Sequence, residues 1–283
     1  MSYRIPFYMH RTREEIQAHY DLEKRLSDRL RHSTAAERKT LYIELYDEIY
    51  ANVPHLKEHA KATSDRYTAG QLHGLKRYLK PDTCFLEVGP GNCALSIAVS
   101  KIVKRVTAVD VSDEFTKSLG ITFPANMDLV ISDGSSVPVP PNSITLAYSA
   151  QLMEHLHPDD ANAQLKNIFT ALAPGGRYIC ITPHRYSGPH DISRYFTDEP
   201  TGFHLKEYTN AEINNLFRVV GFTNLRSLVG LKGWFIEMPF SIALTTERIL
   251  DRLPTGLRRF LANSPPGRAI LGVRVVAEKP SKM

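Results

Sequence analysis

Residues 85–94 read FLEVGPGNCA, and this stretch decides the fold. Its apolar start predicts a strand, and the two glycines, Gly89 and Gly91, predict the tight turn that follows it. Glycine accepts a positive φ and lets a ligand come close to the backbone. Apolar residues resume after Asn92, which predicts a helix that Asn92 caps. A strand, a glycine-rich turn and a helix in this order are typical of the first unit of an open α/β sheet with a ligand at its edge.

The segments on either side of this stretch differ in hydrophobic period. Before residue 81, apolar residues recur at spacings of three and four among many charges, as in the stripe of Tyr46, Ile49 and Tyr50, which predicts amphipathic helices. After Pro81, short apolar runs alternate with helical segments, which indicates βαβ units and a parallel sheet. We expect strands at 84–88, 105–109, 129–132, 144–148, 177–182, 222–229 and 270–277, and helices at 14–31, 36–52, 68–79, 93–103, 113–119, 159–172 and 210–220.

These elements predict a Rossmann-like α/β fold whose sheet has seven strands, most of them parallel. We expect residues 1–80 to form an N-terminal helical cap and residues 81–283 to form the ligand-binding domain. Within that domain, residues 231–268 form a mostly helical insertion before the last strand. One α/β domain with additions fits a chain of 283 residues better than two independent domains.

Composition narrows the class of protein. The formal net charge is +5, but lysines and arginines are scattered, whereas a nucleic-acid-binding surface shows a concentrated basic patch. The three cysteines form no CxxC pair, which argues against a disulfide scaffold or a cysteine zinc site. No run of 18 apolar residues is present, and the first residues lack the apolar core of a signal peptide. We therefore expect a cytoplasmic protein without a transmembrane segment.

Acidic residues recur where the predicted strands end. Asp110 lies 23 positions after Glu87 (110 − 87), and Asp133 lies another 23 positions on (133 − 110). Ligands of open α/β sheets bind outside the carboxyl ends of the strands. There, Asp110 can accept hydrogen bonds from the ribose hydroxyls of an adenosine, and Asp133 from the adenine amino group. Glu87 lies beneath the turn, where it can meet an ammonium group of the ligand.

With these residues, the chain resembles a class I S-adenosylmethionine-dependent methyltransferase of the broad type 11 group, over roughly residues 80–230 and the last strand. The resemblance also rests on Met153-Glu154-His155-Leu156 and on the turn Leu172-Ala173-Pro174-Gly175-Gly176. It implies S-adenosylmethionine as cofactor. Cys93 stands where the family often has a third glycine, and we expect tighter helix packing there rather than lost binding. The expected cofactor-binding residues are Glu87, Gly89, Gly91, Asn92, Asp110, Val111, Asp133, Gly134, Ser149 and Gln151.

Two other functions remain open. Residues 89–94 also fit a dinucleotide fingerprint, so an NAD-dependent dehydrogenase is an alternative, but the pyrophosphate at the helix N-terminus would be repelled by Glu87. A protein that binds the cofactor without methylating, or a pericyclase-like catalyst on the same fold, is the second alternative. Residues 148–151 read YSAQ, where nucleic-acid-modifying branches of the family have an Asn/Asp-Pro-Pro-Tyr motif. We therefore expect a small-molecule acceptor and no nucleic acid.

The acceptor site is less defined. The loop 182–195 is dense in ionisable side chains, and histidine is the most frequent general base. Our hypothesis is O-methylation, in preference to N- or C-methylation, of a small hydrophobic or natural-product-like acceptor. The candidate bases are His190 and His184, with His155 as the alternative, and the candidate acceptor-binding residues are Tyr67, Arg194, Tyr195 and Trp234.

Two further expectations concern metals and partners. His155, His157 and Asp159 have side chains that suit a divalent ion, but their spacing needs an extended segment, so we expect no metal site. The apolar residues 233–244, followed by several arginines, favour a lid over the acceptor. A peripheral contact with an anionic membrane is the alternative for this segment, and a homodimer is left open.

Overall fold

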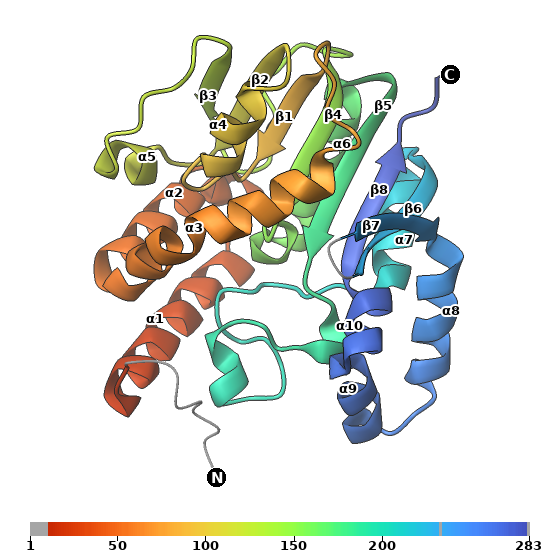
Figure 1. Cartoon of the computed structure of the whole chain (residues 1–283). Helices are drawn as coiled ribbons and strands as arrows, with labels where there is room; N and C mark the ends of the chain where they lie inside the picture. Colours follow the sequence, from red (N-terminus) through yellow and green to blue (C-terminus); the bar gives the residue numbers. More distant parts are fainter. Residues whose placement is uncertain (1–10, 232–233, 282–283) are drawn as a thin grey trace.

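The computed structural model describes residues 11–231 and 234–281, with the side chains of 54–64 and 231–234 outside the described part. A single sheet runs through the molecule in the strand order β3-β2-β1-β4-β5-β8-β6-β7 (Figure 1). The strands are β1 (Cys84–Val88), β2 (Arg105–Asp110), β3 (Met127–Ile131), β4 (Ile144–Ala150), β5 (Leu172–Thr182), β6 (Thr223–Leu231), β7 (Trp234–Pro239) and β8 (Val273–Glu278).

The sheet confirms the predicted Rossmann-like fold and corrects its strand count. β1 to β5 are mutually parallel, and β8 lies antiparallel between β5 and β6. The prediction of seven strands is wrong, because β7 pairs antiparallel with β6 from Arg226↔Pro239 to Leu231↔Trp234. We assigned this apolar run to the helical insertion. Its backbone instead satisfies the open edge of β6, and the helices α8 (Phe240–Asp251), α9 (Thr255–Asn263) and α10 (Pro265–Leu271) follow it.

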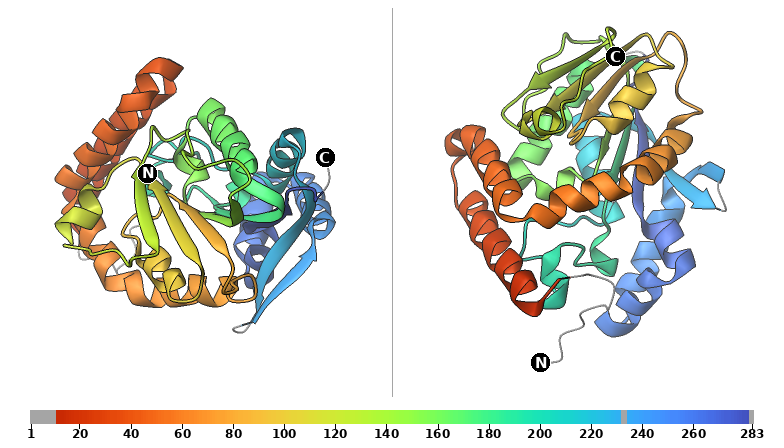
Figure 2. Two further views of the ribbon diagram at one scale, coloured as in Figure 1. Left: turned by 90° about the horizontal axis from the view of Figure 1, so that it is seen from above. Right: turned by 60° about the vertical axis from the view of Figure 1, so that its left-hand side comes forward.

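Helices cover both faces of the sheet. Figure 2 shows α3 (Pro54–Leu75) and α4 (Ala94–Ser100) on one face, with α6 (Pro158–Ala171) and α7 (Asn210–Val220) on the other. α6 buries Ala161, Leu165 and Ile168, one stripe at helical spacing, against the strands. The short helix α5 (Glu114–Ser118) follows β2. In the described part of the chain, no helix is both long and apolar enough to cross a membrane.

Two capped helices precede α3 and lie below the carboxyl ends of the strands in Figure 1. They are α1 (Arg13–Arg31) and α2 (Ala35–Asn52), and each begins with a capping box, formed by Thr12 with Glu15 and by Thr34 with Glu37. Both helices agree with the prediction. The third helix does not, because α3 already begins at Pro54 rather than near residue 68. Proline suits the first turn of a helix, where its missing N–H costs no hydrogen bond.

A buried ion pair fixes α2 to the sheet domain. Arg38 of α2 donates to both carboxylate oxygens of Asp160 on α6, at 2.5 and 3.0 Å, and both residues are under 9% exposed. Tyr42 Oη adds a hydrogen bond to Asp160 at 2.8 Å and accepts one from the backbone N–H of His157 at 2.9 Å. Two planar groups held by two parallel bonds set an orientation as well as a distance. The ion pair therefore determines how α2 lies against the sheet edge.

Asp160→Ala should lower the free energy of unfolding by about 3–5 kcal/mol, because it leaves the Arg38 guanidinium buried without a counter-charge. The matched control is Asp159→Ala. The side chain of Asp159 is 83% exposed, so its loss at the helix N-terminus should cost less than about 1 kcal/mol. Urea unfolding of both variants measures the difference, and equal losses would contradict the anchoring role of Asp160.

Candidate functional site

The glycine-rich turn has the conformation that its sequence predicts. Gly89 has φ +70 and donates its N–H to Val109 O at 2.9 Å, and a Cβ at this position would lie 3.0 Å from Leu152. Gly91 has φ +54 and donates its N–H to Asp110 Oδ2 at 3.1 Å. The end of β2 therefore holds the turn after β1, and the two segments form one rigid edge.

Cys93 also adopts a left-handed conformation, with φ 57, and it is the N-cap residue of α4. A residue with a Cβ is disfavoured there by about 1–2 kcal/mol relative to its right-handed conformation. The Cys93 side chain is fully buried in the core with Leu95 and Val99. The departure from the family's third glycine thus strains the backbone and leaves the ligand side of the turn unchanged. The prediction that Asn92 caps this helix is wrong by one position: the N-cap is Cys93, and Asn92, one residue before it, accepts a hydrogen bond from the Ala94 N–H at 3.1 Å.

A cavity of about 360 Å³ lies at the carboxyl ends of β1, β2 and β4. It brings together seven of the residues that the sequence singled out: Gly89, Gly91, Asp110, Val111, Gly134, Gln151 and His155. We call it the cofactor cavity.

Two buried acids lie beside the turn. Burial raises the pKa of Glu87 to about 7, against the opposing hydrogen bond that Ser96 Oγ donates to its Oε2 at 2.6 Å. Burial also raises the pKa of Asp110 to about 6, although the backbone N–H groups of Val111 and Gly91 donate to it. Both acids are thus short of the positive charge or hydrogen-bond donors that would stabilise their ionised forms. A ligand with cationic and hydroxyl groups supplies what this edge lacks.

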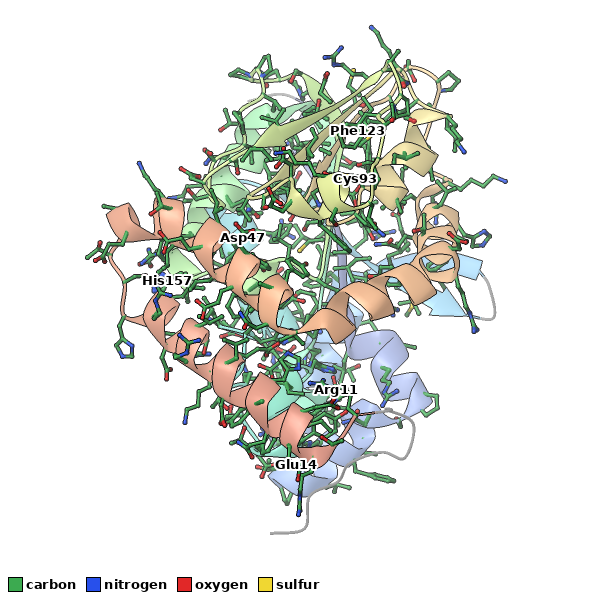
Figure 3. All side chains as sticks on the ribbon, turned by 90° about the vertical axis from the view of Figure 1, so that its left-hand side faces the viewer. Arg11, Glu14, Asp47, Cys93, Phe123 and His157 are labelled. Carbon is green, nitrogen blue, oxygen red and sulfur yellow. The ribbon has the colours of Figure 1, made fainter. Side chains whose placement is uncertain are left out.

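Helix α2 forms the opposite wall of the cofactor cavity through Tyr42, Tyr46, Ile49 and Tyr50. Tyr50 stacks on Phe115 of α5, with ring centroids 5.5 Å apart. Asp47 accepts a hydrogen bond from Ser112 Oγ at 3.3 Å, and Figure 3 shows Asp47 on the α2 helix, near the glycine-rich turn labelled at Cys93.

Gly134, with φ +87, lets this wall approach closely. A Cβ at this position would lie 2.9 Å from Tyr42 Cδ2. The cap and the loop after β3 therefore meet at a glycine.

A second cavity, of about 780 Å³, adjoins the first. Gln151 lines both cavities and has a left-handed backbone, with φ 54. We call the second one the acceptor-side cavity. Its lining includes Tyr67 and Gln71 of α3, Tyr148, Ile179, Ile181, Leu228, Phe235, and the two arginines Arg66 and Arg274.

Four expected cofactor residues lie outside the cavity lining: Glu87, Asn92, Asp133 and Ser149. Glu87 is buried beneath the turn, as described above. The Asp133 carboxylate accepts hydrogen bonds from the backbone N–H groups of Ser135 and Ser136, at 3.0 and 2.7 Å, and so orders its own loop. Ser149 is 1% exposed and shares a hydrogen bond with Tyr178 Oη at 2.7 Å.

The ionisable side chains of the loop 182–195 have partners within the loop and on other elements. His184 is 2% exposed, with Nε2 at 2.9 Å from Glu247 Oε2, while its Nδ1 accepts from the Tyr186 N–H. The exposed His190 shares a hydrogen bond with Ser187 Oγ at 2.9 Å. Neither histidine lines either cavity.

The acceptor candidates Arg194 and Tyr195 also lie apart from the two cavities. The Arg194 guanidinium lies over the ring of Tyr195, 4.8 Å from its centroid, and donates to its hydroxyl. Of the acceptor candidates in the described part, only Tyr67 lines the acceptor-side cavity. The backbone of Trp234 begins β7, and its side chain lies outside the described part.

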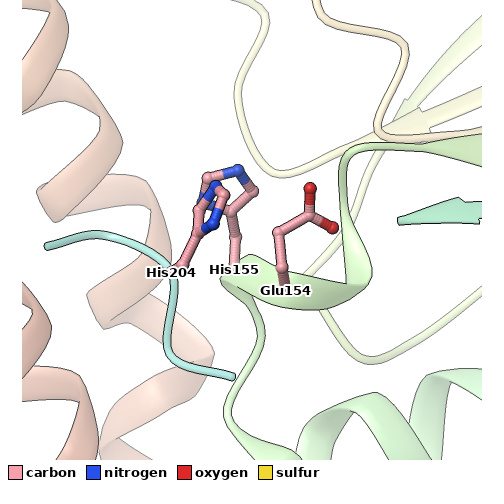
Figure 4. A group of neighbouring side chains, drawn as sticks. All are labelled: Glu154, His155 and His204. Atoms are coloured by element: carbon pink, nitrogen blue, oxygen red, sulfur yellow. The ribbon is translucent and has the colours of Figure 1, made fainter. Parts of the chain in front are cut away.

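His155 is the only histidine of the three candidates in the cofactor cavity. Its Nδ1 lies 3.0 Å from Phe203 O, so Nδ1–H donates and Nε2 keeps a free lone pair. Burial, with the nearby His204, lowers the pKa of His155 to about 3. His155 is therefore neutral near pH 7. Figure 4 shows it beside Glu154 and His204.

Several lining residues were missed by the sequence analysis: Tyr42, Phe115, Leu152, Leu156, Phe203, Arg66, Gln71 and Phe235. The aromatic stripe of α2 was visible as a helical period. Residues 1–80 were expected to cap the open mouth of the sheet, but no local pattern indicated which of their side chains would line the cavity.

Comparison with known proteins agrees with this geometry. Residues 86–180 match the family model described as "Methyltransferase domain". No curated protein matches the sequence closely enough to be called a relative.

Among solved structures, a putative methyltransferase of Haloferax volcanii, in complex with the Trm112 methyltransferase activator, aligns with TM-score 0.56 and 18% identity, over 79% of this chain and 94% of that one. A SAM dependent methyltransferase from Archaeoglobus fulgidus gives TM-score 0.51 and 17% identity, over 76% and 94%. At these identities the similarity establishes the fold, which is that of class I methyltransferases.

Glu87→Gln should stabilise the ligand-free protein at pH 8 by about 3 kcal/mol, which corresponds to a pKa raised from 4.5 to about 7. Because the folded-state pKa lies above the unfolded value, the wild type loses stability as the pH rises through this interval, whereas the amide has no charge to bury. The gain should therefore shrink below about 1 kcal/mol at pH 5. Urea unfolding at both pH values, with the exposed Glu114→Gln as control, measures it. A gain that does not change with pH would contradict the assignment.

Proposed function

We propose that this chain, whose residues 86–180 match a methyltransferase domain, transfers a methyl group from S-adenosylmethionine to a small, largely apolar acceptor, preferably at a hydroxyl oxygen. One observation carries the proposal. The cofactor cavity has the glycine-rich turn and Asp110 on one side, and it adjoins a larger, separate cavity at Gln151. Two adjoining cavities fit a reaction between two bound molecules.

The charge of the site supports this cofactor. S-adenosylmethionine supplies an electrophilic methyl group on a sulfonium, and it also carries an ammonium group and two ribose hydroxyls. Asp110 would accept from the ribose hydroxyls, and the buried Glu87 would offset the ammonium charge from beneath the turn. Both acids have pKa values raised by burial, so both gain from such a ligand. The pyrophosphate of NAD would instead place negative charge beside two carboxylates.

The acceptor-side cavity supports the acceptor class. Its volume of about 780 Å³ is within the range of small-molecule sites, and its lining combines aliphatic and aromatic side chains with Tyr67, Arg66 and Arg274. An acceptor with an apolar body and an anionic or hydroxyl group fits this lining.

His155, rather than the loop histidines, is the group we assign to the acceptor. It lines the cofactor cavity close to Gln151 in sequence, and its Nε2 can receive a hydrogen bond. Its pKa of about 3 means that it is neutral near pH 7 and a weak base, so Nε2 would position the hydroxyl by accepting its hydrogen bond rather than by taking its proton. The loop histidines have other contacts: His184 is buried against Glu247, and His190 shares a hydrogen bond with Ser187.

Calorimetry should detect binding of S-adenosylmethionine and S-adenosylhomocysteine, with no binding of NAD. Asp110→Ala should weaken binding by about 1.5–3 kcal/mol, because it removes an ionised hydrogen-bond acceptor. Asp128→Ala, which changes an exposed acid on β3 paired with Arg105, is the matched control and should bind as the parent does. Tight NAD binding without sulfonium binding would overturn the proposal.

His155→Gln should lower turnover of a hydroxyl acceptor by roughly 10²-fold or more, since misplacement of the reacting oxygen costs about that much. Cofactor affinity should stay within a few-fold of the parent. Formation of S-adenosylhomocysteine from labelled donor is the readout, and a protein that binds the donor without forming it would be a non-methylating binder. If His190→Gln loses as much activity as His155→Gln, the loop hypothesis is the better one.

A further inference from the structure

Glu154, His155 and His204 meet behind the cofactor cavity (Figure 4). Each offers one ligand atom, and these atoms all lie within 4.8 Å of one another. Glu154 and His155 belong to a short 3-10 helix, Met153–His155, that follows β4, whereas His204 comes from the segment before α7. The cluster therefore joins two parts of the chain that are distant in sequence. Ligand atoms bound to one ion at about 2.1 Å lie at most about 4.2 Å apart, so a small side-chain rotation closes the site.

The histidines are held as metal ligands usually are. His155 Nδ1 lies 3.0 Å from the Phe203 carbonyl oxygen, and His204 Nδ1 lies 2.8 Å from Glu207 Oε1. A metal-bound histidine almost always donates its second ring N–H to a carbonyl or a carboxylate, which fixes the tautomer and the ring orientation. Here both kinds of support are present, and in each ring they leave Nε2 with the free lone pair. The two rings are nearly perpendicular, at 84°, with centroids 4.8 Å apart.

The buried carboxylate of Glu154 is a second, independent observation that points to a ligand at this cluster. Its side chain is 0% exposed, and Thr182 Oγ1 donates to Oε2 at 2.9 Å. Oε1 has no hydrogen-bond partner among the described residues. A buried carboxylate oxygen without a partner costs free energy, and buried charges are normally paired or bound to a metal.

The charge around the cluster also favours a cation. Two buried carboxylates, Glu154 and Glu207, lie beside His204, and Glu207 Oε2 is likewise without a partner in the described part of the chain. A neutral His204, the form with a free Nε2 lone pair, offsets neither carboxylate. A divalent ion bound at Nε2 carries two positive charges and would offset both.

We propose that Glu154, His155 and His204 bind one divalent first-row transition-metal ion, such as Mn²⁺, Fe²⁺, Co²⁺ or Zn²⁺. Two imidazoles and one carboxylate suit these ions and leave coordination positions open, whereas Mg²⁺ prefers oxygen ligands alone. This set replaces the trio of His155, His157 and Asp159 that the sequence suggested. His157 caps α6 through the Asp159 N–H and does not join the cluster. Glu207 is a positioning residue that acts through His204.

The site also deepens the proposed function, on which this step rests. With Nε2 of His155 bound to the ion, the ion rather than the imidazole would hold the acceptor hydroxyl. His155 lines the cofactor cavity, so open positions of the ion on that side would face the acceptor oxygen. A bound ion lowers the pKa of a coordinated hydroxyl and fixes its position. Acceptors that offer a hydroxyl oxygen would then be preferred over amines of the same shape.

Metal binding can be tested without cofactor or acceptor. The full-length protein is treated with a chelator and then titrated with Co²⁺. Visible absorption of the bound ion and calorimetry measure the binding, and Mg²⁺ is the comparison ion. We expect one equivalent of Co²⁺ to bind and Mg²⁺ to fail to displace it. Glu154→Gln and His204→Gln should each lose more affinity than the roughly 10–100-fold that outer-shell changes cost, and Glu207→Gln should fall within that range.

His157→Gln is the matched control and should bind Co²⁺ as the parent does. Circular dichroism and thermal melting of each variant without metal identify any variant that fails to fold. A rise in the melting temperature of the parent protein on addition of Co²⁺ tests binding without any substitution. No Co²⁺, Mn²⁺ or Zn²⁺ binding by the parent overturns the proposal, as does an equal loss in His157→Gln. Co²⁺ binding without S-adenosylmethionine binding would instead contradict the proposed function and leave the metal site standing.

Discussion

The ion pair between Arg38 and Asp160 determines where the N-terminal helices lie, and the cofactor cavity depends on it. The sheet by itself provides only an open edge, with the glycine-rich turn and Asp110 on it. The cavity acquires its second wall because α2 is held there by two charged hydrogen bonds and by Tyr42, all shielded from water. The aromatic residues of α2 then face the turn at a fixed distance. A charge interaction remote from the glycine-rich turn therefore defines the shape of the ligand site.

The sequence predicted those parts of the site that short-range rules govern. Gly89, Gly91 and Asp110 were found because a tight turn needs glycine and because each β–α unit places a strand end at a regular interval. For the loop 182–195, the sequence did not show that His184 and His190 would line neither cavity. Its density of ionisable groups reflects mutual satisfaction, as in His184 with Glu247, and that pairing spans 63 residues. The extra strand β7 and the role of His204 also depend on contacts between distant segments, which a local pattern does not contain.

The two sides of the site have different origins in the chain. The glycine-rich turn, Asp110, Gln151 and His155 all lie within residues 86–180, the part that matches the methyltransferase domain. Much of the acceptor-side cavity lies outside it, on α3, β6, β7 and β8. His204 lies outside it as well. The part that matches the family thus lines most of the cofactor cavity, while the segments before and after it line much of the second cavity. Gln151 stands where the two meet.

The contact between Gly134 and Tyr42 couples the core to one of these additions. Gly134 has a positive φ, and a methyl group on it would press against the Tyr42 ring. In an evolutionary sense the two positions are then not independent. In a chain without the cap helix, a side chain at position 134 would no longer clash with Tyr42. The positive φ at this position would still favour glycine. A chain that gains such a cap can place an aromatic ring at position 42 only if glycine is already present at 134.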